Sequence, residues 1–497
     1  DRPIEILRAA LDEEPFATLY RTALAARLRA AGEAEEAERI LLEGTKLENP
    51  AVAGTAWLDL GNHYLEFEDY SAAASALEQA VEISEELTPQ LAFSFADALV
   101  MAGRYERALE IAREMEVPAL RELMFGRAHL AKGRPAEALE HFGEGLRLWP
   151  NNAAARYYAA LASEAVGDFD RAISEYRYAI RVDPNATDAP LRLARLHEAE
   201  GAYALGLVAS RQTGRPGGTG GQGNPDLETE LVALRLAARL GRLAEMRGSL
   251  ARLIERPRVR GRVVAALAEG ARARLGPGAA AERVLKNEQL DLTNPRDAEA
   301  LRVLVVDLGA TGDADAALPY VEAALGAHPD AVVFNEIRGI ALEQSGSPGE
   351  EVRAAYQRVL ELDPENALAL AGLGRLATDP EEALGLYTRA AEADPADPAP
   401  QRAAAELLVR LDRREEAERR LAELLREHPY DAAAAARLAE LRLEREAETD
   451  RTLELARRAV RFGRGPEAYE LLARVHQRRG EAELASEASL RAEQTQR

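Results

Sequence analysis

A glycine-rich run, GRPGGTGGQGNP at 214–225, is the part of the sequence whose spacing could hold a cofactor. Gly218-x-Gly220-x-x-Gly223 matches the loop that binds the pyrophosphate of a dinucleotide. That loop works between a strand and a helix whose N-terminus meets the phosphates. Here the preceding residues have a helical pattern and no P-loop lysine is present, so we expect no cofactor. The run is instead typical of a flexible insertion between two helices.

Metal ligation is the next chemistry to consider, because the chain has seven His and no Cys. The histidines stand at 63, 129, 141, 197, 328, 428 and 476. They form no HExxH motif and no pair with the spacing of zinc ligands. We therefore predict no metal site.

Adjacent carboxylates could act as a general acid and base. Two such pairs, Glu35-Glu36 and Glu381-Glu382, fall where the first turn of a helix is expected. Carboxylates are favoured there by the helix dipole, so we interpret both pairs as helix-capping residues. The sequence accordingly predicts no catalytic residues and no enzyme.

The clearest pattern is a helix–turn–helix unit. Between 57 and 80 the sequence reads Trp57-x2-Leu60-Gly61-x2-Tyr64 and then Ala73-x3-Leu77-x2-Ala80. A turn residue followed five positions later by Ala recurs at Gly32/Ala37, Gly103/Ala108, Gly133/Ala138, Gly167/Ala172, Gly312/Ala317, Asp412/Ala417 and Gly480/Ala485. The turn needs a residue that tolerates positive φ, and the alanine fits where two helices cross closely.

Proline marks the ends of these units. It stands at Pro50, Pro150, Pro184, Pro329, Pro364, Pro395 and Pro429. Pro150 and Pro184 are 34 residues apart (184 − 150), which gives the period of the repeat. His197 and His476 stand at the helix position of Tyr64, so we expect both to be packed side chains.

This spacing resembles that of the tetratricopeptide repeat family over roughly residues 16–494. The resemblance implies an all-α fold, an α-solenoid of stacked helix–turn–helix repeats with roughly fourteen helix pairs in a right-handed superhelix. We expect an N-terminal array at 1–213, a Gly/Pro-rich flexible insertion at 214–226 and a C-terminal array at 227–497. The signature is weaker at about 227–292, where we expect degenerate repeats.

Composition supports this fold class and excludes others. Runs with period-two alternation are absent, so no sheet domain is expected, and no 18-residue apolar run predicts a membrane span. The net charge of −22 argues against nucleic acid as the main partner. Arginine replaces lysine except at Lys46, Lys132 and Lys286, a bias that indicates a GC-rich, bacterial genome.

The resemblance also implies which residues meet a partner. In the family, the first helix of each repeat lines the concave face and its fifth position points into it. That position holds Leu58, Phe93, Leu123, Tyr157 and Leu191 in the N-terminal half. Beside them, at the ninth position, lie Asn62, Asp97, Arg127 and Arg195, which could fix a peptide backbone. The fifth position holds Arg302, Glu336, Ala369 and Arg402 in the C-terminal half.

Two interpretations of the apolar row remain open. It is either a contact site for a partner, as exposed apolar stripes usually are, or it packs against the adjacent first helix. The first interpretation predicts that the N-terminal groove, rather than the charged C-terminal one, holds the partner.

We expect a non-catalytic protein–protein interaction scaffold that binds partner polypeptides along its concave surface. It would be a subunit of a larger bacterial assembly, with an envelope assembly as one candidate. The alternative is a transient adaptor or chaperone-like regulator that binds a peptide segment. The expected partners are other proteins, with no nucleic acid and no membrane span. The sequence starts at Asp1 rather than Met, which favours a processed, periplasmic or exported protein over a cytoplasmic one.

The glycine-rich run should be the preferred site of limited proteolysis, because its glycines leave little to offset the entropy of ordering it. Trypsin should therefore cleave first at Arg211 or Arg215, as mass spectrometry of the fragments would show. Early cleavage inside the repeats, with 211–225 intact, would contradict this prediction.

Overall fold

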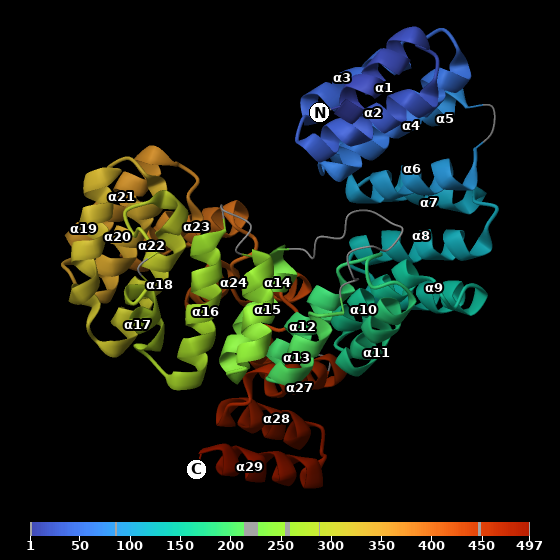
Figure 1. The fold of residues 1–497 in the computed structure, drawn as a ribbon. Coiled ribbons are helices and arrows are strands. Elements are labelled where there is room, and N and C mark those ends of the chain that lie inside the picture. The colour runs from blue at the N-terminus through green and yellow to red at the C-terminus, as the bar shows by residue number, and fades with distance from the viewer. Residues whose placement is uncertain are drawn as a thin grey trace. The chain divides into compact units, whose positions relative to one another are not determined.

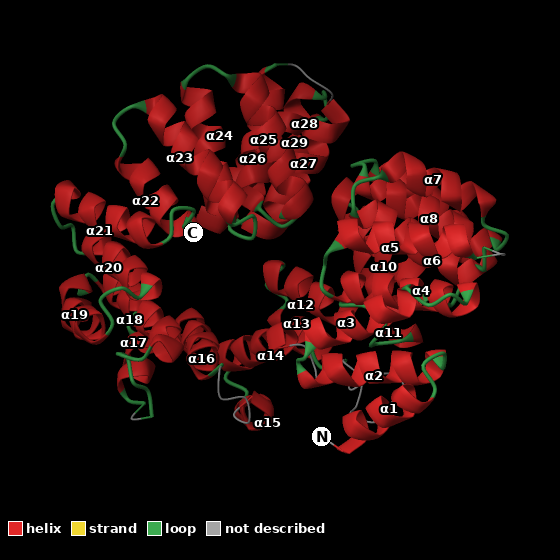
Figure 2. Ribbon diagram, turned by 90° about the horizontal axis from the view of Figure 1, so that it is seen from above, coloured by secondary structure: helices red, strands yellow, loops and turns green. Residues whose placement is uncertain are grey.

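A computed structural model describes residues 2–84, 87–212, 227–253, 259–287, 289–445 and 449–496. These residues form 29 α-helices, two short 3₁₀ helices and no strand. Figure 2 shows helices and loops in the described residues. The predicted all-α solenoid of helix pairs is confirmed. The chain divides into two compact units, residues 1–182 (unit 1) and 183–497 (unit 2).

Unit 1 begins with one unpaired helix, α1 (Arg2–Glu13), which packs on the helix that follows it. Helix pairs then succeed one another, blue to blue-green in Figure 1. They are α2 (Thr18–Ala31) and α3 (Ala34–Thr45), α4 (Pro50–Glu66) and α5 (Tyr70–Ile83), α6 (Pro89–Met101) and α7 (Tyr105–Glu114), α8 (Pro118–Ala131) and α9 (Pro135–Leu148), and α10 (Ala153–Val166) and α11 (Phe169–Val182).

Unit 2 continues the same alternation of first and second helices. Its pairs are α12 (Ala189–Ala199) and α13 (Tyr203–Ala209), α14 (Leu227–Leu240) and α15 (Leu243–Leu253), α16 (Arg260–Leu275) and α17 (Ala279–Leu285), α18 (Ala298–Thr311) and α19 (Leu318–Ala327), α20 (Val332–Gln344) and α21 (Gly349–Leu362), α22 (Ala367–Leu376) and α23 (Pro380–Ala393), α24 (Pro398–Arg410) and α25 (Arg414–Glu427), α26 (Ala432–Glu444) and α27 (Thr449–Gly463), and α28 (Pro466–Arg478) and α29 (Ala482–Gln496). The 3₁₀ helices η1 (Pro295–Asp297) and η2 (Ala314–Ala317) flank α18.

The turn between the two helices of a pair has the backbone conformation that the sequence predicts. All six predicted turn glycines have positive φ, from +72° at Gly133 to +85° at Gly167. Asp412, the predicted substitute for glycine, has φ +59°. The alanine that follows each turn is fully buried in every predicted unit except the last, where Ala485 is partly exposed. The predicted register is therefore confirmed.

Close crossings of first and second helices hold several of the repeats together. A first-helix residue with little or no side chain lies against a large side chain of a second helix. A Cβ added at Gly126 of α8 would lie 2.6 Å from Cδ1 of Phe142 on α9. In unit 2 the ring of Tyr356 lies between Gly339 of α20 and Gly372 of α22. Both rings are fully buried.

The region of weak repeat signature is still built of helix pairs. Gly241 keeps the turn conformation with φ +69°, but α15 and α17 are short. Asp307 of α18 is fully buried and stabilises the start of α17. Its Oδ2 accepts hydrogen bonds from the backbone N–H groups of Ala280 and Ala281, at 2.9 and 2.8 Å. The Asp307 carboxylate, from the next helix pair, thus caps α17, a helix of seven residues that is too short to be stable alone.

The predicted insertion, 214–226, lies outside the described residues. Its role as a boundary between two arrays stays a prediction. The dinucleotide-like glycine spacing falls within the same run.

Substituting alanine for two glycines of one helix pair should change stability in opposite directions. Gly126→Ala should lower the free energy of unfolding by about 1–3 kcal/mol, because the new methyl group collides with Phe142. Gly143→Ala on α9 should raise it by about 0.5–1 kcal/mol, since a Cβ there meets no atom within 4 Å. Chemical denaturation monitored by circular dichroism measures both, and a stabilising Gly126→Ala would show that the crossing is loosely packed.

Candidate protein-binding surface

In unit 1 the first helices lie closer to one another than the second helices do. Each of α2, α4, α6 and α8 packs directly on the next first helix, whereas neighbouring second helices are not packed on one another to the same extent. The layer with the closer spacing is the inner side of a curved stack. Side chains at the fifth and ninth positions of these helices form what we call the first-helix surface of unit 1. Its members among the predicted site residues are Leu58, Asn62, Phe93, Asp97, Leu123, Arg127 and Tyr157.

The apolar row is only partly accessible. Leu123 is 2% exposed and belongs to the core around Phe142, so the expectation that it points freely into a groove is wrong. Leu58 and Phe93 are half-buried and pack their edges against the core of α5–α7. Tyr157 is half-buried as well, with its ring centroid 5.2 Å from that of Tyr158. Packing between first helices therefore accounts for part of the row.

Asp97 and Arg127 form an ion pair between α6 and α8. Arg127 is 7% exposed and the Asp97 side chain 25%. The guanidinium also lies over the ring of Tyr158, with Cζ 4.5 Å from the centroid. Burial raises the pKa of Asp97, and the positive charge of Arg127 opposes that rise. The two groups thus compensate each other, which corrects the expectation that they stand ready to fix a peptide backbone.

The first helices α4 and α6 carry three carboxylates, Asp59, Glu66 and Asp97, and no Lys or Arg, which we did not predict. Glu66 is paired with Arg29 of α2, at 2.9 Å. Asp59 of α4 is partly buried and accepts a hydrogen bond from the Thr22 hydroxyl, and burial raises its pKa. Asn62 is exposed beside it. A signal was present in the sequence, because no Lys or Arg occurs from 47 to 103. The acidic residues in that stretch are Glu48, Asp59, Glu66, Glu68, Asp69, Glu78, Glu82, Glu85, Glu86 and Asp97.

The two remaining predicted site residues, Leu191 and Arg195, belong to α12 of unit 2. Leu191 is buried in the core and so is not a contact residue in this structure. Arg195 is exposed, with its guanidinium 4.0 Å from a carboxylate oxygen of Glu228. These two residues therefore belong to a different unit from the other seven predicted site residues.

The charged row predicted for the C-terminal half is neutralised internally. Arg302 donates to Glu336 across α18 and α20, at 2.7 Å. The other oxygen of Glu336 accepts from Asn366, also at 2.7 Å. Arg402 lies 3.3 Å from Asp431, and Ala369 is fully buried. This row offers few charges that a partner could use without breaking an existing pair.

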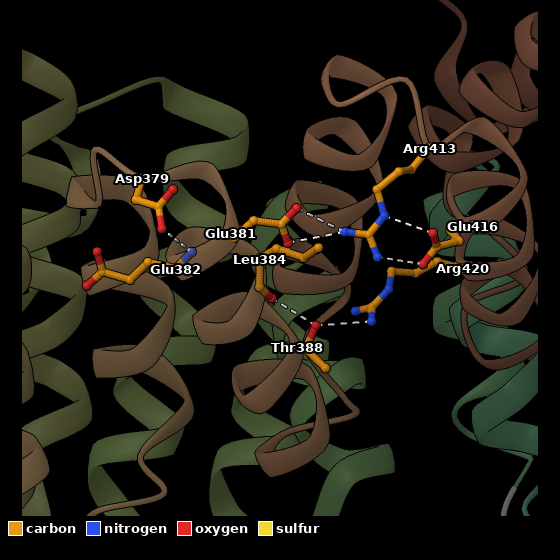
Figure 3. A network of polar contacts seen from close by, with 8 residues as sticks. All are labelled: Asp379, Glu381, Glu382, Leu384, Thr388, Arg413, Glu416 and Arg420. Atoms are coloured by element: carbon orange, nitrogen blue, oxygen red, sulfur yellow. Dashed lines mark hydrogen bonds and ion pairs between the residues drawn. The ribbon is translucent and has the colours of Figure 1, made fainter.

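The second helices carry polar contacts of a different kind, shown in Figure 3. Arg413, at the start of α25, donates to Glu416 on its own helix at 2.8 Å and to Glu381 on α23 at 3.2 Å. Arg420 donates to the Thr388 hydroxyl at 3.1 Å. These groups are largely exposed, and exposed pairs stabilise a fold only slightly. They join neighbouring repeats without forming a hollow in the surface.

His197, His476 and the two carboxylate pairs lie where the sequence predicts. His197 and His476 are buried, and their Nδ1 atoms lie 3.1 and 2.6 Å from carboxylate oxygens of Glu200 and Glu481. The pairs at 35–36 and 381–382 occupy first turns of second helices. Within the described ranges, no group of three or more His, Asp and Glu is placed to hold a metal ion. None of the described helices is long and apolar enough to cross a bilayer.

Removing Arg127 should reveal how much free energy of unfolding depends on pairing the partly buried Asp97 carboxylate. Arg127→Ala should lower the free energy of unfolding by about 3 kcal/mol at neutral pH, because it leaves a buried carboxylate unpaired. Adding Asp97→Asn should recover roughly 2 kcal/mol of that loss. The recovery should fade at acidic pH, since the raised pKa lets Asp97 take up a proton in the folded state and become neutral.

Urea denaturation of both variants from acidic to neutral pH measures this difference. The double variant lacks the titrating group, so it serves as the control at every pH. A recovery that does not change with pH would mean that Asp97 stays charged or solvated in the fold.

Comparison with known proteins identifies the repeat. A tetratricopeptide repeat model matches residues 58–119, 123–165, 162–210, 302–367 and 353–398, and a second tetratricopeptide repeat model matches 376–441. No curated protein matches the sequence.

Three solved structures are among those that the chain matches. The Cut9–Hcn1 hetero-tetramer of APC/C is 15% identical over 91% of this chain and 88% of its own, with a TM-score of 0.37. Yeast Tom70 is 13% identical over 90% of this chain and 97% of its own, with a TM-score of 0.39. YrrB, described as a TPR protein with an unusual peptide-binding site, is 23% identical over 37% of this chain and 96% of its own, with a TM-score of 0.27.

The repeat models together cover more than half of the sequence. The described residues fold into the paired helices that these models represent. The chain therefore belongs to the tetratricopeptide repeat family.

Proposed function

We propose that this protein is a non-catalytic interaction scaffold whose unit 1 binds a segment of a partner polypeptide on its first-helix surface. Repeat proteins of this fold are typically interaction scaffolds. The observation that carries the proposal is the combination of partly exposed Leu58, Phe93 and Tyr157 in one helix layer. Apolar side chains that remain partly open on a surface usually mark a contact site.

The charge of this surface suggests the chemistry of the partner. Its helices α4 and α6 carry Asp59, Glu66 and Asp97 and no Lys or Arg, although Arg29 and Arg127 from neighbouring helices pair with Glu66 and Asp97. A segment that presents apolar side chains together with Lys or Arg would complement it. Leu123 would then support the surface from beneath, and the Asp97–Arg127 pair would fix the spacing of α6 and α8.

The partner-binding surface fits two biological roles, a permanent subunit and a transient adaptor. A scaffold would be a permanent subunit of a bacterial assembly, with an envelope assembly as one candidate. A transient adaptor would use the same surface but release its partner. Purification from the native source separates these two cases, because a subunit retains one partner in stoichiometric amounts and an adaptor retains varied partners in small amounts.

Replacing the two half-buried aromatic residues should weaken partner binding. Phe93→Ala with Tyr157→Ala should cost about 2 kcal/mol of binding free energy, close to a thirtyfold loss of affinity, because aromatic anchors carry much of the energy of an interface. A pull-down with the native partner, followed by titration of the purified pair, measures the loss. Binding should also weaken as salt rises, since the complementary charges are screened.

Trp149→Ala provides a matched control, because Trp149 is an exposed aromatic residue at the end of α9, outside the first-helix surface. Melting curves and helicity must stay close to those of the wild type in all variants. If the folded double variant binds normally while Trp149→Ala does not, the partner uses another face and the proposed surface is wrong.

A further inference from the structure

Unit 2 contains a contact between segments that are far apart in sequence. The turn after α12 meets the C-terminal end of α27, some 260 residues later. Arg461 donates through Nε to Oε1 of Glu200 at 2.8 Å, and its Nη2 donates to the same oxygen. Arg464 donates through Nη2 to the backbone carbonyl of Ala199 at 2.7 Å. Two arginines of one helix end thus hold one turn.

The turn is shaped to accept these arginines. Gly201 has φ +68° and lies directly beneath the Arg464 guanidinium, so a Cβ there would stand 2.7 Å from Arg464 Cζ. Glu200 is fixed from its other side by Nδ1 of His197, at 3.1 Å. Burial works to raise the pKa of Glu200, but the hydrogen bonds from His197 and Arg461 outweigh it and keep that pKa below its usual value. The carboxylate is therefore charged when Arg461 binds it.

The contact is separate from the core of the repeats. α27 packs on α26 and α28, but it is not packed on α12 or α13 in the way that neighbouring helices are. The residues that meet are charged side chains and a backbone carbonyl. Hydrogen bonds between polar groups of this kind can break without unfolding either repeat.

We propose that Arg461 and Arg464 form a latch that closes unit 2 by holding α27 against the turn after α12. With the latch closed, the two ends of the array from α12 to α27 are fixed at a short distance. With the latch open, that distance can increase and vary. A contact of a few polar groups gives two states whose populations a partner can shift by binding one of them more tightly.

The chain contains no cysteine, which allows two introduced cysteines to carry distance probes without further changes. Ala204→Cys on α13 and Glu467→Cys on α28 place spin labels at exposed positions near the two sides of the latch, on residues that do not form it. Pulsed electron paramagnetic resonance on the full chain should give one narrow, short distance. Arg461→Ala with Arg464→Ala should broaden the distribution and lengthen its mean by more than about 10 Å, the width of one helix.

Two controls separate the latch from general effects. Arg413→Ala removes an exposed arginine with its own ion pairs elsewhere in unit 2 and should leave the distance unchanged. Gly201→Ala should open the latch by displacing Arg464, whereas Gly480→Ala should not, because it strains a turn with φ +77° where a Cβ meets no atom within 4 Å. An unchanged distance in the folded Arg461/Arg464 variant, or an equal change with Gly480→Ala, would overturn the proposal.

Discussion

The structure depends on the close crossing between the first and second helix of each pair. Where Gly126 faces Phe142, or Gly339 and Gly372 enclose Tyr356, the backbone of one helix touches a ring of another. Such a contact fixes both the rotation and the axial position of each helix, because a shift by one residue would bring a side chain into the ring. With the rotation fixed, the fifth and ninth positions of every first helix share one face. The crossing therefore decides which side chains a partner can meet.

The two units use that face differently. In unit 2 the charges along it are largely matched with one another, as Arg302 with Glu336 and Asn366 with Glu336 illustrate. In unit 1 Asp97 pairs with Arg127 and Glu66 with Arg29, while the side chains of Leu58, Phe93 and Tyr157 stay half-buried in the same helix layer. A matched set of charges contributes little to new binding, whereas partly exposed apolar side chains gain when a partner covers them. This contrast is why we place the partner on unit 1.

Local features of the fold were predictable from sequence, and distant ones were not. Gly32 and Asp412 predict turns because few residues tolerate positive φ. This requirement depends only on the residue at the turn, so the sequence reveals it. The depth of Leu123 was not predictable, since it depends on how closely α9 and α10 approach. Glu200 and Arg461 are 261 residues apart and belong to no repeated motif, so spacing gave no signal for their contact. The acidity of 47–103 was visible, but its meaning required knowing which face each carboxylate occupies.

Site-specific photo-crosslinking tests the central claim, that a partner binds the first-helix side of unit 1, most directly. Asn62 on α4 and Ser75 on α5 are exposed residues of one helix pair that lie on its first and second helices. Benzoylphenylalanine replaces each residue in turn, and cells that express the variants are irradiated before the adducts are identified by mass spectrometry. The account predicts an abundant adduct to the partner from position 62 and none above background from position 75. An adduct that forms only from position 75 would show that the partner binds the second-helix side and would contradict the account.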